Sequence, residues 1–293
     1  MEPVAVSENQ NHMLDEIADV IGDNSKFLLT THEGPDGDAL GSLLGMQTML
    51  ETLGKDSVMF LAAKEFPLPI EYRHLPLEGV FHEPPADLRD RVVIFLDCGN
   101  IDRMPVDFLR NGGTFVVNID HHHDNTRFGD YNFVNDKASC TAEIIYELAV
   151  LLDVKVSPLM ARALYIGIIT DTGKFMYDAT DARTHEVAAA LIRAGVDIDD
   201  VNRRLYESVP FEKLKLLRLA LDKTELKCDG RLIVAGDSPP FFGDPNFQVA
   251  RYASTEVIDS DRDGLANNVE DGAAHGGDQR GGRRRAGDLV DSH

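Results

Sequence analysis

The chain has few cysteines, and this limits its covalent chemistry. Only Cys98, Cys140 and Cys228 occur among 293 residues, odd in number and widely spaced. This pattern argues against a disulfide framework and for a reducing compartment, the cytoplasm. It also means that no cysteine is needed as a zinc ligand.

Long apolar runs are absent as well. No run approaches the roughly 20 residues that a helix needs to cross a bilayer, and the polar segment 1–11 lacks the apolar stretch of a signal peptide. We therefore expect a soluble chain without membrane binding.

Basic residues are scarce relative to acidic ones. There are 29 Lys and Arg against 50 Asp and Glu, and the net charge of −21 opposes binding of an extended duplex through counterion release. Most of this acidity is expected to be solvated surface. Carboxylates gathered in a cleft would instead hold divalent cations, and these would admit a small anionic substrate.

What the sequence does contain is an alternation of apolar runs and helical patterns, over a length that favours two domains. The runs predict strands at 26–31, 57–62, 91–97 and 114–119, and the 3.6-residue patterns predict helices at 39–53, 140–152, 158–169, 182–194 and 211–222. Continuous apolar character is typical of parallel strands buried on both faces. The fold class predicted is therefore α/β, with a mainly parallel sheet flanked by helices.

Carboxylates and imidazoles follow the predicted strands, where ligands collect in such sheets. They are His32, Asp36 and Asp38 after the first strand, Asp97 after another, Asp120, His121, His122 and His123 after a third, and Asp171 at the end of a predicted helix. Taken singly, Asp36 and Asp38 fit a helix N-cap, Asp97 a turn, and His121 a hydrogen-bonded core residue. Taken together, they indicate a metal site.

The expected ligands are oxygen and imidazole nitrogen, without thiolate. Such a set suits Mn²⁺ or Mg²⁺, with Fe²⁺ or Co²⁺ as alternatives. The ligands suffice for two ions, which together would activate a water molecule for the hydrolysis of phosphate esters.

These residues resemble the DHH phosphoesterases. The four motifs of that family occur in order as Thr31-His32-Glu33-Gly34-Pro35-Asp36-Gly37-Asp38-Ala39-Leu40-Gly41-Ser42, Asp97, Asp120-His121-His122, and Asp171. Spacing and flanking residues such as 170–175 and 183–184 are similar to the branch of bifunctional oligoribonucleases and 3′-phosphoadenosine 5′-phosphate phosphatases, the nanoRNases. The resemblance covers about 11–236.

The resemblance implies a role for each matching residue. One ion would be held by His32, Asp36 and Asp97, and the other by Asp38, Asp97, His121 and Asp171, with Asp97 as the bridge. His122 would contact the scissile phosphate or the leaving group and assist its protonation. Asp120 would orient a histidine.

Other polar residues remain open at this stage. Arg183 is either a substrate-phosphate contact, as guanidinium chemistry suggests, or an exposed helix residue without a role. Asp171 has an alternative as the end of a buried helix, although an unpaired carboxylate there would be costly. We expect His185 to lie on the surface and His123 in a loop.

The predicted domains are 11–195 as the DHH catalytic domain, 196–222 as a helical linker, and 223–293 as a partial substrate-binding domain with a polar tail. Segments 223–228 and 231–235 predict a hairpin, and apolar periodicity fades after about Gly236. The family's Gly-Gly-Gly-His segment, which helps to grip the substrate, is absent. We hypothesise truncation or a changed reading frame near Gly236, with a disordered, low-complexity tail beyond it.

The tail contains a calcium-loop pattern. Residues 259–270 match the twelve-residue spacing, whose ligand positions fall on Asp259, Asp261, Asp263, Leu265 and Glu270. Its context is poor, because Gly272, Gly276 and Gly277 discourage an exiting helix and no partner loop exists. A Ca²⁺ site and a chance match both remain open.

The favoured function is a two-metal phosphohydrolase that acts on short single-stranded oligoribonucleotides, on the 3′-phosphate of nucleoside bisphosphates, or on both. One alternative keeps the metal core but changes the substrate to a cyclic dinucleotide, pyrophosphate or single-stranded DNA. The other is a catalytically impaired metal-binding product that lacks its substrate clamp. A homodimer is an expectation from the family.

Overall fold

The computed structural model describes residues 8–104, 109, 113–222, 224–227 and 232–235. The chain divides into two compact units, Met1–Val209 and Pro210–His293. The division falls inside the segment 196–222 that the sequence analysis assigns to a linker. The predicted calcium loop at 259–270, Cys228 and the tail after Gly236 all lie outside the described residues.

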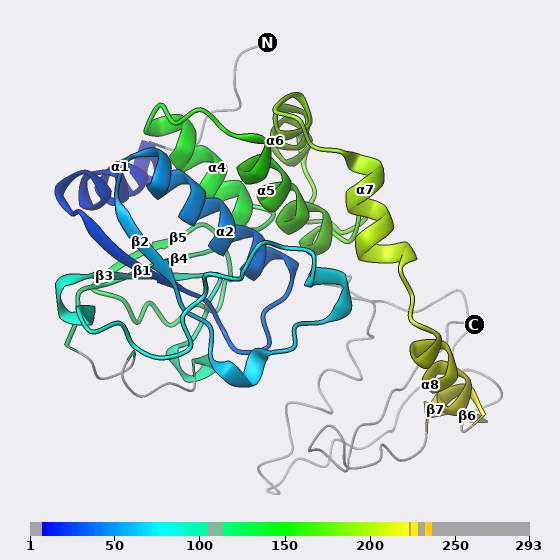
Figure 1. Cartoon of the computed structure of the whole chain (residues 1–293). Helices are drawn as coiled ribbons and strands as arrows, with labels where there is room; N and C mark the ends of the chain where they lie inside the picture. Colours follow the sequence, from blue (N-terminus) through cyan, green and yellow to red (C-terminus); the bar gives the residue numbers. More distant parts are fainter. Residues whose placement is uncertain (1–7, 105–108, 110–112, 223, 228–231, 236–293) are drawn as a thin grey trace, which may run out of the picture. The chain divides into compact units, whose positions relative to one another are not determined.

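The first unit is built on a five-stranded parallel sheet (Figure 1). Its strands are β1 (Lys26–Thr30), β2 (Asp56–Met59), β3 (Val92–Leu96), β4 (Val116–Asp120) and β5 (Tyr131–Val134). Their order is β2-β1-β3-β4-β5, and every neighbouring pair is parallel. The sequence-based prediction of a mainly parallel α/β sheet is thereby confirmed.

The two faces of the sheet are covered differently. Alternate strand residues such as Phe27 and Ile94 join a large core with the helices, whereas Leu28, Val93 and Phe95 pack with loop residues on the opposite face. Burial on both faces explains why β1, β3 and β4 read as continuous apolar runs. Figure 1 shows α2, α4 and α5 stacked over the helix-covered face.

The helices of this unit are α1 (Glu8–Asp23), α2 (Gly37–Thr52), α4 (Thr141–Leu151), α5 (Pro158–Asp171), α6 (Ala182–Arg193) and α7 (Ile198–Asn202). A π-helical turn, η5 (Arg203–Glu207), follows α7. Helix α5 begins with Pro158 at its first position, and Ser157 caps it by accepting a hydrogen bond from the Met160 amide. The predicted helices at 140–152, 158–169 and 182–194 therefore exist with shifts of one or two residues.

Helices α2 and α5 approach very closely, because α2 carries glycine at every fourth position. A Cβ at Gly41 would lie 2.4 Å from the Ala163 carbonyl oxygen, and a Cβ at Gly37 or Gly45 would collide with Thr170 or Leu164. Positions four apart share one face of a helix. This glycine face lets the start of α2 meet the end of α5, where Asp38 and Asp171 lie.

An ion-pair network around the buried Arg91 lies at the opposite, amino-terminal end of the sheet. Arg91 is 7% exposed and donates to Asp56, to Asp87 and to the Phe27 carbonyl oxygen at 2.9 to 3.3 Å. Lys26 adds a contact to Asp87 at 2.8 Å. The network joins the start of β1 to the segments that precede β2 and β3.

The described part of the second unit contains α8 (Phe211–Leu221) and an antiparallel pair, β6 (Thr224–Lys227) and β7 (Leu232–Ala235). The pair falls where the sequence predicts a hairpin. Among the described residues, no helix combines the length and the apolar character required to cross a membrane.

Candidate metal centre

The candidate residues converge at the point where the order of the strands reverses. β2 lies on one side of β1 and β3 on the other, and ligands of such sheets bind at the carboxyl ends of the strands at this switch point. His32 follows β1, and Asp97 follows β3. The third loop, after β4, starts at Asp120, the last residue of that strand.

Three overlapping groups of side chains there present ligand atoms that lie within 4.8 Å of one another. They are His32 with Asp36 and Asp97; Asp38 with His121 and Asp171; and Asp97 with Asp120, His121 and His122. Asp97 and His121 each belong to two of the groups. The structure thus brings together all the residues for which the sequence predicts a metal role, from segments up to 139 positions apart, counted from His32 to Asp171.

Asp97 is the centre of the cluster, and its side chain is almost fully buried. Its Oδ2 lies 3.6 Å from His32 Nε2, while its Oδ1 lies 3.6 Å from His121 Nε2 and from His122 Nδ1. Thr141 Oγ1 donates to Oδ1 at 3.2 Å. Burial alone would raise the pKa of Asp97, but the His32 hydrogen bond and the other imidazoles hold it below its ordinary value.

The backbone of Asp97 is also unusual, with φ at +56°, in the left-handed region. Its amide still donates to the Ile119 carbonyl oxygen at 3.0 Å, so the residue is held against β4. Such a conformation persists where surrounding contacts fix it, and such residues gather at functional sites. Here the residue with this conformation is Asp97 at the end of β3, whose side chain points toward three imidazoles.

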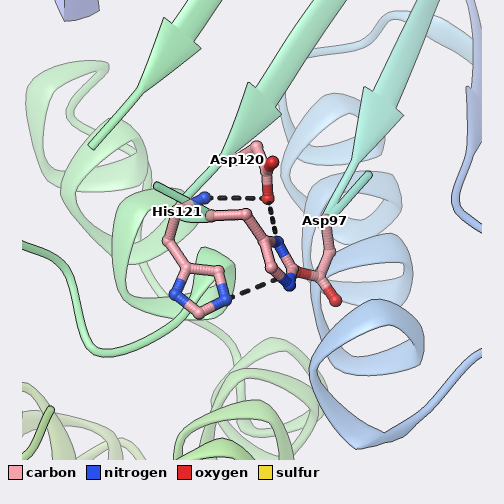
Figure 2. Close-up of side chains that lie close together, drawn as sticks. Asp97, Asp120 and His121 are labelled. Carbon is pink, nitrogen blue, oxygen red and sulfur yellow. Dashed lines mark hydrogen bonds and ion pairs between the residues drawn. The ribbon is translucent and has the colours of Figure 1, made fainter. Parts of the chain in front are cut away.

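Asp120 forms hydrogen bonds with the two histidines that follow it (Figure 2). Its Oδ1 accepts from the His121 amide at 2.9 Å and contacts His122 Nδ1 at 2.7 Å, and its Oδ2 accepts from Asn125. The hydrogen bond with Asp120 raises the pKa of His122 to about 9, with Asp97 and Asp171 adding to the effect. His122 therefore carries a proton near neutral pH, while Asp120 fixes the direction of its ring.

Asp38 and Asp171 face His121 from α2 and α5. Asp38 is 1% exposed, and its carboxylate accepts from the amides of Thr141 and Ala142, the first residues of α4, at 2.7 and 2.9 Å. Burial raises the pKa of Asp38 well above its ordinary value, and the charges of Asp97 and Asp171 raise it further. Burial likewise raises the pKa of Asp171 to about 6, partly offset by His121, which lies 3.5 Å away.

Asp36 caps a helix and also lies in one of the three groups, two placements that the sequence analysis treated as alternatives. Its Oδ1 caps α2 by accepting from the amides of Asp38 and Ala39, both at 3.0 Å. One carboxylate oxygen is enough for this cap, and Asp36 also belongs to the group with His32 and Asp97. The helix cap and the ligand position therefore coexist.

These groups fit a pair of hard divalent cations. Five carboxylates, from Asp36, Asp38, Asp97, Asp120 and Asp171, gather with three imidazoles and no thiolate in the three groups. Burial is the main cause of the raised pKa values of Asp38 and Asp171, and the charges of the neighbouring carboxylates raise both further. Oxygen-rich sets of this kind suit Mn²⁺, Mg²⁺ or Co²⁺.

Arg183 lies outside the three groups. Its Nε donates to Glu147 Oε1 of α4 at 3.1 Å, and its side chain is 24% exposed. His185, expected on the surface, is exposed and stacks on Phe175 with ring centroids 4.9 Å apart. The exposed His123 lies in the turn after His122.

Sequence reasoning missed several supporting residues. Thr141 donates to Asp97, and Arg103 Nη2 lies 3.0 Å from His32 Nδ1. Asn125 donates to Asp120 and to Asn118, and the Asn118 side-chain amide donates to the Cys98 carbonyl oxygen. Asn118 precedes Asp120 by two positions on the same strand, so the period of a strand would have placed both on one face. Nothing local to Thr141 or Arg103 marks them, because their contacts join distant segments.

Comparison with known proteins agrees with this geometry. Residues 26–168 match the model of the DHH family, N-terminal domain. The chain is 32% identical over 243 residues to the bifunctional oligoribonuclease and PAP phosphatase NrnA of Thermus thermophilus, covering 78% of this chain and 70% of that one. It is 30% identical over 204 residues to the probable bifunctional oligoribonuclease and PAP phosphatase NrnA of Streptococcus mutans, covering 70% and 64%.

The alignments do not extend over the whole length of either relative. The chain spans 64% of the length of the Streptococcus relative. Among solved structures, an exopolyphosphatase-related protein from Bacteroides fragilis superposes with a TM-score of 0.67 at 21% identity, covering 78% of this chain and 68% of that one. That likeness concerns the fold.

Proposed function

Because the chain belongs to the DHH family, we propose that it is a two-metal-dependent phosphohydrolase acting on short oligoribonucleotides, on the 3′-phosphate of nucleoside bisphosphates, or on both. The observation that carries the proposal is the meeting of the three ligand groups through Asp97 and His121. The names of the Thermus and Streptococcus relatives supply the substrate class.

We assign His32, Asp36 and Asp97 to one ion, and Asp38, Asp97, His121 and Asp171 to the other, with Mn²⁺ as the first candidate and Mg²⁺ or Co²⁺ as alternatives. The two oxygens of Asp97 face different imidazoles, Oδ2 toward His32 and Oδ1 toward His121, which suits a bridging carboxylate. Bound divalent cations would supply a hydroxide nucleophile near neutral pH and stabilise charge on the phosphoryl oxygens.

His122 is the proposed proton donor to the leaving oxygen. Its pKa of about 9 keeps the imidazole protonated near neutral pH, and its side chain is about one third exposed, so a substrate can reach it. Asp120 holds the ring through Nδ1. With Nδ1 engaged in this way, Nε2–H is the group left to donate to the departing oxygen.

Short single-stranded substrates suit the electrostatics better than a long duplex. The net charge of −21 opposes a polyanion over most of the surface, so binding must rely on the local centre. A cytoplasmic location, a homodimer and Arg183 as a contact to the substrate are part of the same proposal. Cys98 and Cys140 are buried free thiols, in keeping with a reducing compartment.

The test is an activity panel on the full chain with Mn²⁺. The substrates are a labelled RNA dinucleotide, 3′-phosphoadenosine 5′-phosphate, a cyclic dinucleotide and pyrophosphate, with a chelator and Asp97→Asn as controls. We expect turnover of one or both of the first two substrates, and none in either control. Turnover of pyrophosphate alone, or of nothing while Mn²⁺ is bound, would refute the proposal.

A further inference from the structure

Arg103 joins the loops that leave β1 and β3. It ends the short helix η4 (Ile101–Arg103), which Asn100 caps by accepting from the Asp102 amide at 2.9 Å. Its carbonyl oxygen accepts from the Glu33 amide at 2.8 Å, and its Nη2 lies 3.0 Å from His32 Nδ1. The side chain is exposed, and its guanidinium lies beside a candidate ligand.

Metal binding through His32 Nε2 would change the hydrogen bonds at His32 Nδ1, where Arg103 lies. His32 Nδ1 has two neighbours, the Glu33 carbonyl oxygen at 2.8 Å, which can only accept, and Arg103 Nη2, which can only donate. His32 Nε2 faces Asp97. If Nε2 gives its lone pair to an ion, the ring proton must be on Nδ1, where it donates to Glu33.

In that tautomer His32 accepts nothing from Arg103. The guanidinium is then an exposed cation next to His32. The backbone of Arg103 is still held by the hydrogen bond from the Glu33 amide. Lys64 and Arg183, in contrast, are engaged with carboxylates: Lys64 binds Glu33, and Arg183 binds Glu147.

The charge of the loaded centre creates a need for such a cation. Five ionised carboxylates and two divalent ions leave a net charge of about −1. A phosphodiester brings one further negative charge and a phosphomonoester up to two. A guanidinium beside the centre offsets one unit of this charge.

We propose that Arg103 binds a non-bridging oxygen of the substrate phosphate, next to the ion assigned to His32, Asp36 and Asp97. This inference rests on the proposed function, because it adds a substrate contact to the same site. The planar fork of the guanidinium matches two phosphate oxygens. A phosphate with two free non-bridging oxygens at this position is therefore bound better than a phosphate in which one of these oxygens is esterified.

The experiment measures phosphate binding separately from turnover. Full-length wild type, Arg103→Ala and Arg103→Lys are loaded with Mn²⁺ and titrated by calorimetry, first with inorganic phosphate and then with adenosine 5′-monophosphate. Arg193→Ala, an exposed arginine in the last turn of α6, is the matched control. The Mn²⁺ affinity of every variant is measured on the same preparations.

We expect Arg103→Ala to weaken binding of both phosphates by on the order of tenfold to a hundredfold, the range for a hydrogen bond to a charged group. Arg103→Lys should fall between Ala and wild type, and Arg193→Ala should match wild type. Mn²⁺ affinity should stay within about twofold, because Arg103 is not one of the ligands. If the alanine variant does not fold, the lysine variant carries the comparison.

Two results would overturn the inference. One is phosphate binding that is unchanged in Arg103→Ala or absent from wild type. The other is a loss of Mn²⁺ affinity by the same factor as phosphate affinity, which would make Arg103 a positioning residue for His32. If wild type binds phosphate through Arg103 but hydrolyses nothing, the inference stands and the proposed reaction fails.

Discussion

The two ends of the parallel sheet use the same residue types in opposite ways. At the amino end, Asp56 and Asp87 each lie against Arg91, whose hydrogen bond is the main reason that the pKa of Asp87 is lowered. At the carboxyl end, burial raises the pKa values of Asp38 and Asp171. At the amino end, Arg91 and Lys26 balance the carboxylates, whereas the carboxyl end gathers five carboxylates around three imidazoles.

This difference separates a structural ion pair from a site that needs an external ion. Replacing a balanced ion pair changes stability and little else. Carboxylates held together without a balancing cation destabilise the metal-free state, and a bound cation relieves that repulsion. The following substitutions and conditions test this comparison between the two ends.

The largest effect is expected from Asp97→Asn. Removing the carboxylate shared by two groups should reduce turnover by more than the tenfold to hundredfold typical of outer partners of a metal ligand, and it should weaken Mn²⁺ binding. Asp87→Asn, at the amino end, is the matched control and should keep both. Steady-state kinetics and calorimetry measure turnover and Mn²⁺ affinity of both variants. Equal losses in the two variants would contradict the proposed difference between the two ends of the sheet.

Asp120→Asn should reduce turnover by about tenfold to a hundredfold, because Asp120 acts through His122 and His121. Without the carboxylate, the pKa of His122 should fall from about 9 toward its ordinary value. The alkaline limb of the pH–rate profile should therefore move to lower pH. A reduced rate with an unmoved profile would assign Asp120 a purely structural role.

Mn²⁺ affinity should fall as the pH falls through about 6. Burial raises the pKa of Asp171 to about 6, so below that pH a proton competes with the ion for the carboxylate. Each displaced proton lowers the affinity about tenfold per pH unit below the pKa. Calorimetry between pH 5 and 8 measures this trend, which Asp171→Asn should flatten. Affinity that rises on acidification would contradict the assignment.

Gly41→Ala should disturb the carboxyl end alone. Its Cβ would lie 2.4 Å from the Ala163 carbonyl oxygen, so α2 and α5 must separate, at a cost of about 1–3 kcal/mol in the free energy of unfolding. Gly22→Ala in α1 is the matched control, since nothing lies within 4 Å of its Cβ. Thermal melts and Mn²⁺ titrations compare the two. A Gly41→Ala protein as stable as the Gly22→Ala protein would show that the helices adapt.

The sequence predicted β1, β3 and β4 because their residues are buried on both faces and stay apolar without interruption. It did not reveal β5 or α1. Strand β5 spans only Tyr131–Val134 and is only partly buried, so its pattern is weak. In α1 the buried residues Leu14, Ile17 and Ile21 are spaced among charged ones, over a stretch that reads as polar.

The candidate ligands were predictable because each follows an apolar run in a parallel sheet, where topology brings the ends together. The supporting contacts were not. Asp38 accepts from the Thr141 amide across 103 positions, and Arg103 meets His32 across 71. Local sequence patterns do not predict contacts between such distant residues. The hydrogen bonds of Asp38 and the position of Arg103 are therefore known only from the folded structure.

The starts of two helices meet at this centre. α2 begins beside Asp36 and α4 begins at Thr141, and an amide at each helix start donates to a carboxylate. The aligned peptide dipoles place about half a positive charge at each helix start. This partial charge belongs to the backbone, so neither acid nor a chelator removes it. The two helix starts therefore continue to offset part of the carboxylate charge when no ion is bound.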